Sequence, residues 1–328
     1  MGYNIKKIFT LSALILFLVL GGSVVVKKVK EHFIKAEIKK QLFKIPNSKP
    51  AIPKVETPKN SPLPRSTSLL IDNSLPDIDR LYQLFVPGPK QFPIVETITY
   101  QSQVPWVKGR LAWIEDYSMH YATPLHFIIH SLHGNNYENH KVMAGSRFNV
   151  LKKNKKIEFL LVADLTMCKM GFYYVDLDSS ERVLLKTYAI AVGKETSEKS
   201  SLTPVGQFSL GSKVALYKPG IKGFFQDKQV DMVEVFGTRW IPFIDAKGNS
   251  TGLGLQGVGW EVDKESGIWR EKSGYVGKAS TEGCIWMHQE DIEALFAIIA
   301  GGRPARIEIV SHFKDAKLPG VEVAVPMG

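Results

Sequence analysis

The feature that most constrains this chain is a glycine-punctuated stretch around one cysteine, Gly277 to Met287, which reads GKASTEGCIWM. An apolar pattern with the i, i+3, i+4, i+7 spacing of a buried helix face follows it at Ile292, Leu295, Phe296 and Ile299. A pair of glycines at 301 and 302 and then Pro304 end the helix. We therefore expect Cys284 in a loop shortly before a helix.

Cys284 has two interpretations at that position. A thiolate attacks acyl carbon well and a neutral thiol poorly, so a catalytic cysteine needs a neighbour that lowers its pKa. A free cysteine is also among the most buried residue types, where it serves only as a small apolar side chain. The residues around Cys284 favour the catalytic interpretation.

Two motifs resemble the signature of the L,D-transpeptidase catalytic domain of the YkuD type. In that family the nucleophile lies in a Ser/Thr-His-Gly-Cys sequence followed by a branched aliphatic residue, Arg and Met. This chain matches it at Thr281, Gly283, Cys284, Ile285 and Met287. The stretch at 203–208, TPVGQF, is similar to the family's Thr-Pro-x-Gly-x-Phe element. The resemblance covers roughly Glu158 to Val310, and it implies no metal or organic cofactor.

The chain departs from the family pattern at three positions. The family's general base is a histidine in a Gly-x-His-Gly segment, and Gln256 occupies that position here. Glu282 replaces the histidine of the cysteine motif, and Trp286 replaces its arginine. A glutamine cannot accept a proton at neutral pH, and a carboxylate close to a thiol raises the thiol pKa. The departures put catalysis in question but not the fold.

The resemblance assigns roles to particular residues. The catalytic set is Cys284 as nucleophile, Gln256 at the position of the family histidine, and Gly283 as a backbone donor to the oxyanion. Substrate contacts are expected from Thr281, Glu282, Trp286 and Gly257. His288 is the candidate for a substitute base, and the alternative is a polar residue that begins the helix.

Composition limits the choice of partners. The chain has 42 Lys and Arg against 32 Asp and Glu, a net charge of +10, which raises nucleic acid as a partner. No zinc-finger spacing, RRM-type aromatic run or helix-turn-helix pattern supports that partner. The lysines cluster near the N-terminus, where attraction to an anionic membrane surface or envelope polymer explains them.

Metal and disulfide chemistry are weakly supported. Four histidines recur at helical spacing, namely His120, His126, His130 and His133. Carboxylate partners that would complete a metal site are missing. Two cysteines are too few for a disulfide scaffold. A bond between Cys168 and Cys284 in an oxidising compartment stays open, although Cys168 lies in an apolar run and is expected in the core.

The N-terminal third is expected to connect a membrane to the folded part. Ile8 to Val26 is uncharged, mostly apolar and close to the roughly 20 residues that cross a bilayer, so residues 1–30 are predicted to be an anchor. A signal peptide is the alternative, because Gly21-Gly22-Ser23 could be a cleavage site. The proline-rich residues 31–95 are predicted to be an extended tether. The resemblance implies an inner-membrane protein with its body in the periplasm.

Two folded modules are expected after the tether. Residues 96–155 show a βααβ order that resembles a LysM module, a binder of N-acetylglucosamine-containing glycans. In this reading Val107 to Leu111 opens the module. Strand-like runs dominate residues 156–312, and we expect a mainly β domain, a β-sandwich with one main helix beside the cysteine. Residues 313–328 are a tail.

The interval Gly259 to Tyr275 is longer than its family counterpart and carries Trp260, Trp269 and Tyr275. We expect either a lid that stacks on substrate or a surface loop that packs its own aromatic side chains.

Three functions follow as hypotheses. The first is a peptidoglycan L,D-transpeptidase that cross-links stem peptides through a Cys284 thioester. The second is a non-catalytic envelope protein that binds peptidoglycan, since the usual histidine is missing. The third is an L,D-carboxypeptidase that uses water as the acceptor.

Overall fold

The computed structural model describes residues 75–197, 200–212 and 214–323. The predicted anchor at 1–30 and most of the predicted tether lie outside the described residues. All of the described residues belong to one compact unit. None of the helices in the described residues is long and apolar enough to cross a membrane.

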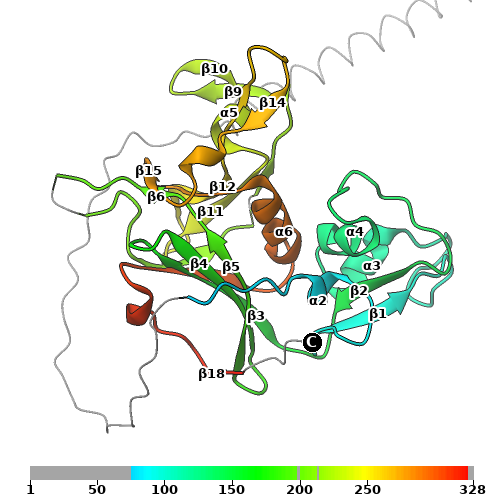
Figure 1. Cartoon of the computed structure of the whole chain (residues 1–328). Coiled ribbons are helices and arrows are strands. Elements are labelled where there is room, and N and C mark those ends of the chain that lie inside the picture. Colours follow the sequence, from blue (N-terminus) through cyan, green and yellow to red (C-terminus); the bar gives the residue numbers. More distant parts are fainter. Residues whose placement is uncertain (1–74, 198–199, 213, 324–328) are drawn as a thin grey trace, which may run out of the picture. The chain divides into compact units, whose positions relative to one another are not determined.

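Strands dominate the described residues, as the sequence predicts. The main sheet has ten strands in the order β16-β12-β11-β7-β17-β3-β4-β5-β18, with β8 paired to β11 (Figure 1). Its strands are β3 (Ile157–Asp164), β4 (Lys169–Asp176), β5 (Glu181–Ala189), β7 (Gly206–Leu210), β8 (Ala215–Leu216), β11 (Arg239–Ile244), β12 (Ser250–Gly257), β16 (Ile285–Met287), β17 (Ala305–Val310) and β18 (Val321–Glu322).

The strands form one continuous sheet where two facing sheets were expected. Strand β17 pairs on both edges, parallel with β3 and antiparallel with β7, and so joins the two halves by backbone hydrogen bonds. The apolar runs predicted at 159–164 and 172–176 fall in β3 and β4, which pair antiparallel along their full length. The mainly β prediction is confirmed, and the strands expected in a sandwich belong to one continuous curled sheet.

Three small sheets accompany the main one in the described residues after Ile157. They are β6 (Val192–Gly193) with β15 (Ala279–Thr281), β9 (Lys222–Phe225) with β10 (Lys228–Asp231), and β13 (Trp260–Val262) with β14 (Trp269–Glu271). The last pair is an antiparallel hairpin. Short helical segments lie at α5 (Met232–Phe236), Ser273–Tyr275 and Phe313–Asp315.

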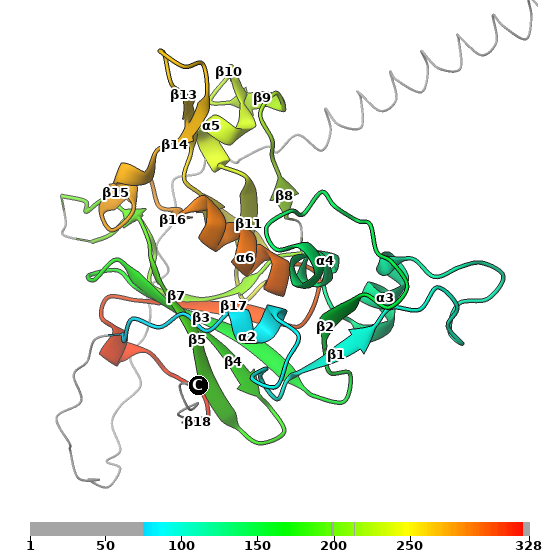
Figure 2. The same cartoon turned by 45° about the vertical axis from the view of Figure 1, so that its right-hand side comes forward.

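The predicted helix after the cysteine is α6 (Gln289–Ile299). All four side chains of its expected apolar face are buried, with at most 6% exposure, which confirms the helical spacing; they are Ile292, Leu295, Phe296 and Ile299. The helix packs against β11 and β12 (Figure 2). It therefore fixes the segment that follows Cys284 to β12, the strand that carries Gln256, and to its neighbour β11.

Residues 95–151 form a strand-helix-helix-strand unit. Its elements are β1 (Val95–Thr99), α3 (Ile114–Tyr121), α4 (Leu125–His133) and β2 (Arg147–Leu151), with β1 antiparallel to β2. The order agrees with the prediction for 96–155, but the opening strand lies earlier than Val107 to Leu111. Helix α4 packs on α6, so this unit contacts the main domain directly. Its resemblance to LysM stays a prediction.

The predicted tether ends too late in the sequence. Residues 75–94 are packed against the rest of the unit, and α2 (Tyr82–Phe85) lies among them. Six of their apolar side chains are buried, with at most 6% exposure; these six are Leu75, Leu81, Leu84, Phe85, Phe92 and Ile94. The frequent prolines concealed this segment, whose leucines and aromatics supply enough apolar surface to pack.

Candidate active site

Cys284 lies in a tight loop between β15 and β16, just before α6. Strand β16 runs parallel to β12, with Leu255 opposite Ile285 and Gln256 opposite Trp286. Cys284 as a whole residue is half-buried. The sequence predicts the loop and the helix, and the structure adds the short strand β16 between them. That strand aligns the cysteine loop with the segment that carries Gln256.

The side-chain hydroxyl of Thr281 bonds to the backbone of the cysteine loop. Thr281 Oγ1 donates to the carbonyl of Cys284 at 2.6 Å and accepts from the N–H of Gly283 at 3.2 Å. Gly283 has a φ of +119°, a conformation that side-chain-bearing residues rarely adopt. A Cβ on it would also lie 2.9 Å from the carbonyl oxygen of Leu202. The loop geometry therefore depends on a threonine at 281 and a glycine at 283.

The upstream motif meets the cysteine loop. Buried Thr203 donates from Oγ1 to the carbonyl of Gly283 at 2.9 Å and accepts from the N–H of Gly193 at 2.7 Å. This hydroxyl thus joins two motifs that lie far apart in the sequence. Sequence analysis found both motifs but not their contact. Nothing in the sequence around Gly193 marks it as part of the site. In the structure, a Cβ at this position would lie 2.4 Å from the backbone nitrogen of Thr203.

Burial raises the pKa of the Cys284 thiol to about 11. A backbone hydrogen bond from Gly254 on β12 acts in the opposite direction, because it stabilises the thiolate. Glu282 is not the cause of the rise. Its side chain is 78% exposed and pairs with Lys194 Nζ at 2.6 Å. The resting thiol is therefore protonated at neutral pH.

Gln256 is buried on β12, and its Nε2 donates to the carbonyl of Val235 at 2.7 Å. Its neighbour Gly257 is also buried and lies opposite Met287. The hydrogen bond holds the Gln256 amide against the segment that contains α5. Gln256 is thus placed on the strand beside the cysteine loop, as expected, with one of its amide atoms already bonded.

His288 is the N-cap residue of α6, and its Nδ1 lies 2.9 Å from Glu271 Oε1. The same carboxylate accepts from the backbone N–H of Gln289 at 3.4 Å. In the described part of the chain no hydrogen bond joins a histidine to the Cys284 sulfur. His288 therefore lies at the helix start, one of its two predicted interpretations.

The interval Gly259 to Tyr275 folds as the β13–β14 hairpin and its exit turn. Glu271 ties the hairpin to the start of α6, and the Tyr275 ring meets Trp286 edge-on with centroids 5.6 Å apart. Trp286 is partly exposed, and Tyr275 of this interval packs against it. The sequence leaves open whether the interval is a lid or a surface loop. In the sequence, the three aromatic residues of the interval are the feature that could have indicated this contact.

The remaining candidate groups lie elsewhere. Cys168 is buried, and both cysteines are free thiols, so the disulfide that the sequence left open is not formed here. Three of the four spaced histidines pack against aromatic rings: His120 stacks on Trp106, whereas His126 and His130 both lie against Tyr137. Among the described residues, no group of three metal-ligating side chains is found.

The chain is similar in sequence to known proteins. Residues 158–307 match the L,D-transpeptidase catalytic domain, YkuD. The matched residues fall within the span from Glu158 to Val310 over which the sequence resembles this family. The Bacillus subtilis (strain 168) protein named "Putative L,D-transpeptidase YqjB" is 34% identical over 119 residues, which are 35% of this chain and 54% of that protein. The chain thus spans about half the length of this curated relative.

Solved structures of similar proteins include an L,D-transpeptidase from Mycobacterium smegmatis. It is 12% identical, with a TM-score of 0.28 over 52% of this chain and 76% of that chain. The helical cell shape determining protein Pgp2 from Campylobacter jejuni is 14% identical, with a TM-score of 0.30 over 50% of each chain.

The thiol pKa predicts a steep pH profile for alkylation of Cys284. Only the thiolate reacts, so below a pKa of about 11 the rate should rise about tenfold for each pH unit. We expect no plateau between pH 6 and pH 9.5 when iodoacetamide labelling is followed by mass spectrometry in a Cys168→Ser variant. A plateau below pH 8 would show that the site contains an activating group not seen in the resting structure.

Proposed function

We propose that the protein is a peptidoglycan L,D-transpeptidase with Cys284 as its nucleophile. The observation that carries this proposal is the hydrogen bond of Thr203 to the carbonyl of Gly283, which joins the two family motifs at one loop. Loops that are braced from both sides hold a nucleophile in one geometry, as catalysis requires. The match of residues 158–307 to the L,D-transpeptidase domain supports the same reaction class.

The proposed reaction has two acyl transfers. The Cys284 sulfur attacks the carbonyl between residues three and four of a tetrapeptide stem, the peptide bond breaks, and D-alanine leaves with the thiol proton on its amine. The resulting thioester is then attacked by an amine of a second stem, which gives a 3→3 cross-link and returns the proton to sulfur. Water as the acceptor would give an L,D-carboxypeptidase instead.

The oxyanion of each tetrahedral intermediate needs a fixed donor. The N–H of Gly283, the donor expected from the sequence, is bonded to Thr281 Oγ1. We therefore propose the backbone N–H of Cys284 for this role. Trp286 with Tyr275, and the exposed Glu282, border the loop and are proposed to contact the stem peptide, whereas Thr281 and Gly257 act by shaping the loop and its neighbouring strand.

A non-catalytic role is the second candidate. It is favoured by the raised pKa of Cys284 and by the hydrogen bond that holds the Gln256 amide on Val235. In that case the protein would bind peptidoglycan without acyl transfer. Both candidates share the rest of the proposal: an N-terminal anchor or signal peptide, a body in the periplasm, and a LysM-like unit at residues 95–151 that concentrates the protein on glycan.

Product analysis separates these functions. Purified protein is incubated with disaccharide-tetrapeptide fragments, and the products are followed by liquid chromatography and mass spectrometry. Transpeptidation predicts free D-alanine together with 3→3 dimers in equal amounts. D-alanine with monomeric tripeptide would indicate a carboxypeptidase. Binding of the fragments without D-alanine release would contradict the enzymatic proposal and support the non-catalytic one.

A further inference from the structure

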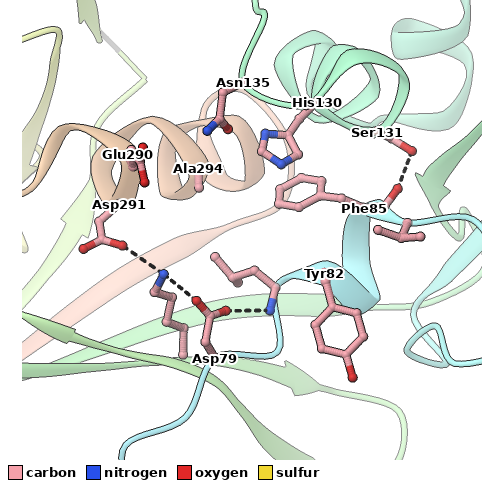
Figure 3. Close-up of a pocket in the computed structure, with 13 residues that line it drawn as sticks. Asp79, Tyr82, Phe85, His130, Ser131, Asn135, Glu290, Asp291 and Ala294 are labelled. Atoms are coloured by element: carbon pink, nitrogen blue, oxygen red, sulfur yellow. Dashed lines mark hydrogen bonds and ion pairs between the residues drawn. The ribbon is translucent and has the colours of Figure 1, made fainter. Parts of the chain in front are cut away.

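A cleft of about 560 Å³ lies where α2, α4 and α6 come together, in a part of the unit that does not contain Cys284 (Figure 3). The strand β5 contributes Lys186 to its lining. Helix α4 belongs to the βααβ unit, α6 to the L,D-transpeptidase domain, and α2 to the segment that precedes both. The cleft is therefore built by three parts of the chain together.

Three of the lining side chains carry aromatic rings, namely Tyr82, Phe85 and His130. Tyr82 is 47% exposed on α2, whereas Phe85 on the same helix is buried. The ring of His130 from α4 packs on Phe85 with centroids 3.8 Å apart (Figure 3). Burial lowers the pKa of His130 to about 4, so its imidazole is neutral at neutral pH. The cleft thus offers flat, uncharged ring surface.

The charges that line the cleft are largely occupied with one another. Lys186 Nζ lies 2.7 Å from Asp79 Oδ2 and 2.9 Å from Asp291 Oδ1. This ion pair joins the segment before α2 to α6 across β5. With Glu290 included, three carboxylates face one ammonium group. The surplus of negative charge disfavours an anionic ligand such as a stem-peptide carboxylate.

Two polar side chains of the lining have unused hydrogen-bonding capacity. Within the described part of the chain, neither the Asn135 amide nor the Glu290 carboxylate makes a hydrogen bond or an ion pair. His130 uses Nδ1 with the hydroxyl of Tyr137 at 2.7 Å, which leaves Nε2 as its other polar atom. An amide, a carboxylate and a neutral imidazole lie around the ring surface and provide donors and acceptors for hydroxyl groups, while the surplus of negative charge excludes anions.

We propose that this cleft binds an uncharged sugar ring of the wall glycan. A sugar presents C–H groups on its faces and hydroxyls at its edge, which match the ring of Tyr82 and the polar groups of Asn135 and Glu290. The proposal rests on the proposed function, because it names the part of peptidoglycan that this chain holds. The cleft takes Gly134 and Asn135 from the loop after α4, but it also requires α2 and α6, which lie outside the βααβ unit.

The location has a consequence for the reaction. Helix α6 lines the cleft with Glu290, Asp291 and Ala294 and begins directly after the strand that follows Cys284. A glycan bound there would be held at a fixed position relative to the helix that carries the nucleophile loop. The cleft would then align the strand whose stem peptide reacts, in addition to retaining the protein on the wall.

Calorimetric titration of the purified full-length chain with β-1,4-linked N-acetylglucosamine tetramer tests the proposal. Tyr82→Ala should weaken binding at least about tenfold, the effect of about 1.4 kcal/mol. Glu290→Gln, an exposed and conservative change, should weaken it about threefold. The matched control is Leu111→Ala, which removes a 55% exposed apolar side chain from the β1–α3 loop and should leave the affinity unchanged.

Each other outcome overturns the proposal. If Leu111→Ala abolishes binding and the two cleft variants do not change it, the ligand sits on the loops of the βααβ unit. If the wild-type chain does not bind the tetramer, the cleft is not a glycan site. Thermal unfolding of each variant separates lost binding from lost folding. D-alanine release from soluble fragments is measured in parallel, so failure of the cleft proposal and failure of the acyl-transfer proposal are distinguished.

Discussion

Replacing Cys284 by alanine should abolish formation of the acyl-enzyme and release of D-alanine. The change removes the only atom proposed to form the thioester, so we expect a fall of at least about a thousandfold, to the uncatalysed background. Intact-protein mass spectrometry after mixing with disaccharide-tetrapeptide should detect the acyl adduct on the wild-type chain and not on the variant. The fold should be kept, because alanine is smaller than cysteine and the loop is held by Thr281 and Thr203.

The chain provides a matched control in its second cysteine. Cys168 is buried, and its thiol donates weakly to the carbonyl of Leu165 at 3.7 Å, away from the loop that contains Cys284. Cys168→Ser should therefore keep both the acyl adduct and the release of D-alanine. If Cys168→Ser abolished the adduct and Cys284→Ala did not, the assignment of the nucleophile would be wrong.

The elements closest to the cysteine could be predicted because their signals are local. The apolar spacing from Ile292 to Ile299 specifies one buried face, and the glycines and proline after it specify the helix end. The loop needs a glycine at 283 because of its positive φ, and the sequence supplies one. These features depend on a few consecutive residues, so they can be recognised before the fold is known.

Contacts between distant segments could not be predicted in the same way. Nothing in the sequence indicates that Thr203 bonds to Gly283, or that Glu271 binds both His288 and the start of α6. These contacts depend on the order of strands in the sheet, which brings segments together that lie far apart in the chain. The end of the tether was misjudged for a related reason, since residues 75–94 are ordered by partners such as Lys186 and Leu185.

The sequence and the structure indicate different causes for the raised pKa of Cys284. The sequence draws attention to Glu282, but the structure turns this carboxylate towards Lys194 and solvent. The cause is burial of the sulfur, which depends on the packing of the whole loop. Activation of the thiol therefore requires a group that takes its proton, and not the removal of a negative charge.

Gln256→His should convert the resting thiol into an active one. Gln256 lies two residues after Gly254 on β12, and Gly254 is the residue whose backbone N–H bonds to the thiol. If one ring nitrogen of a histidine kept the hydrogen bond to Val235, the other would be free to accept the thiol proton. We expect D-alanine release at pH 7 to rise roughly 100-fold, the lower end of what a positioned general base contributes.

The apparent pKa of Cys284 alkylation should fall in the same variant, because an imidazole that takes the proton leaves a thiolate beside an imidazolium. Gln256→Asn is the matched control, since it changes the length of the side chain and its bond to Val235 without adding a base. An equal gain in both variants would mean that release of the Val235 bond, and not proton transfer, activates the site. No change in alkylation or D-alanine release for Gln256→His would mean that position 256 does not reach the thiol, and would favour the non-catalytic role.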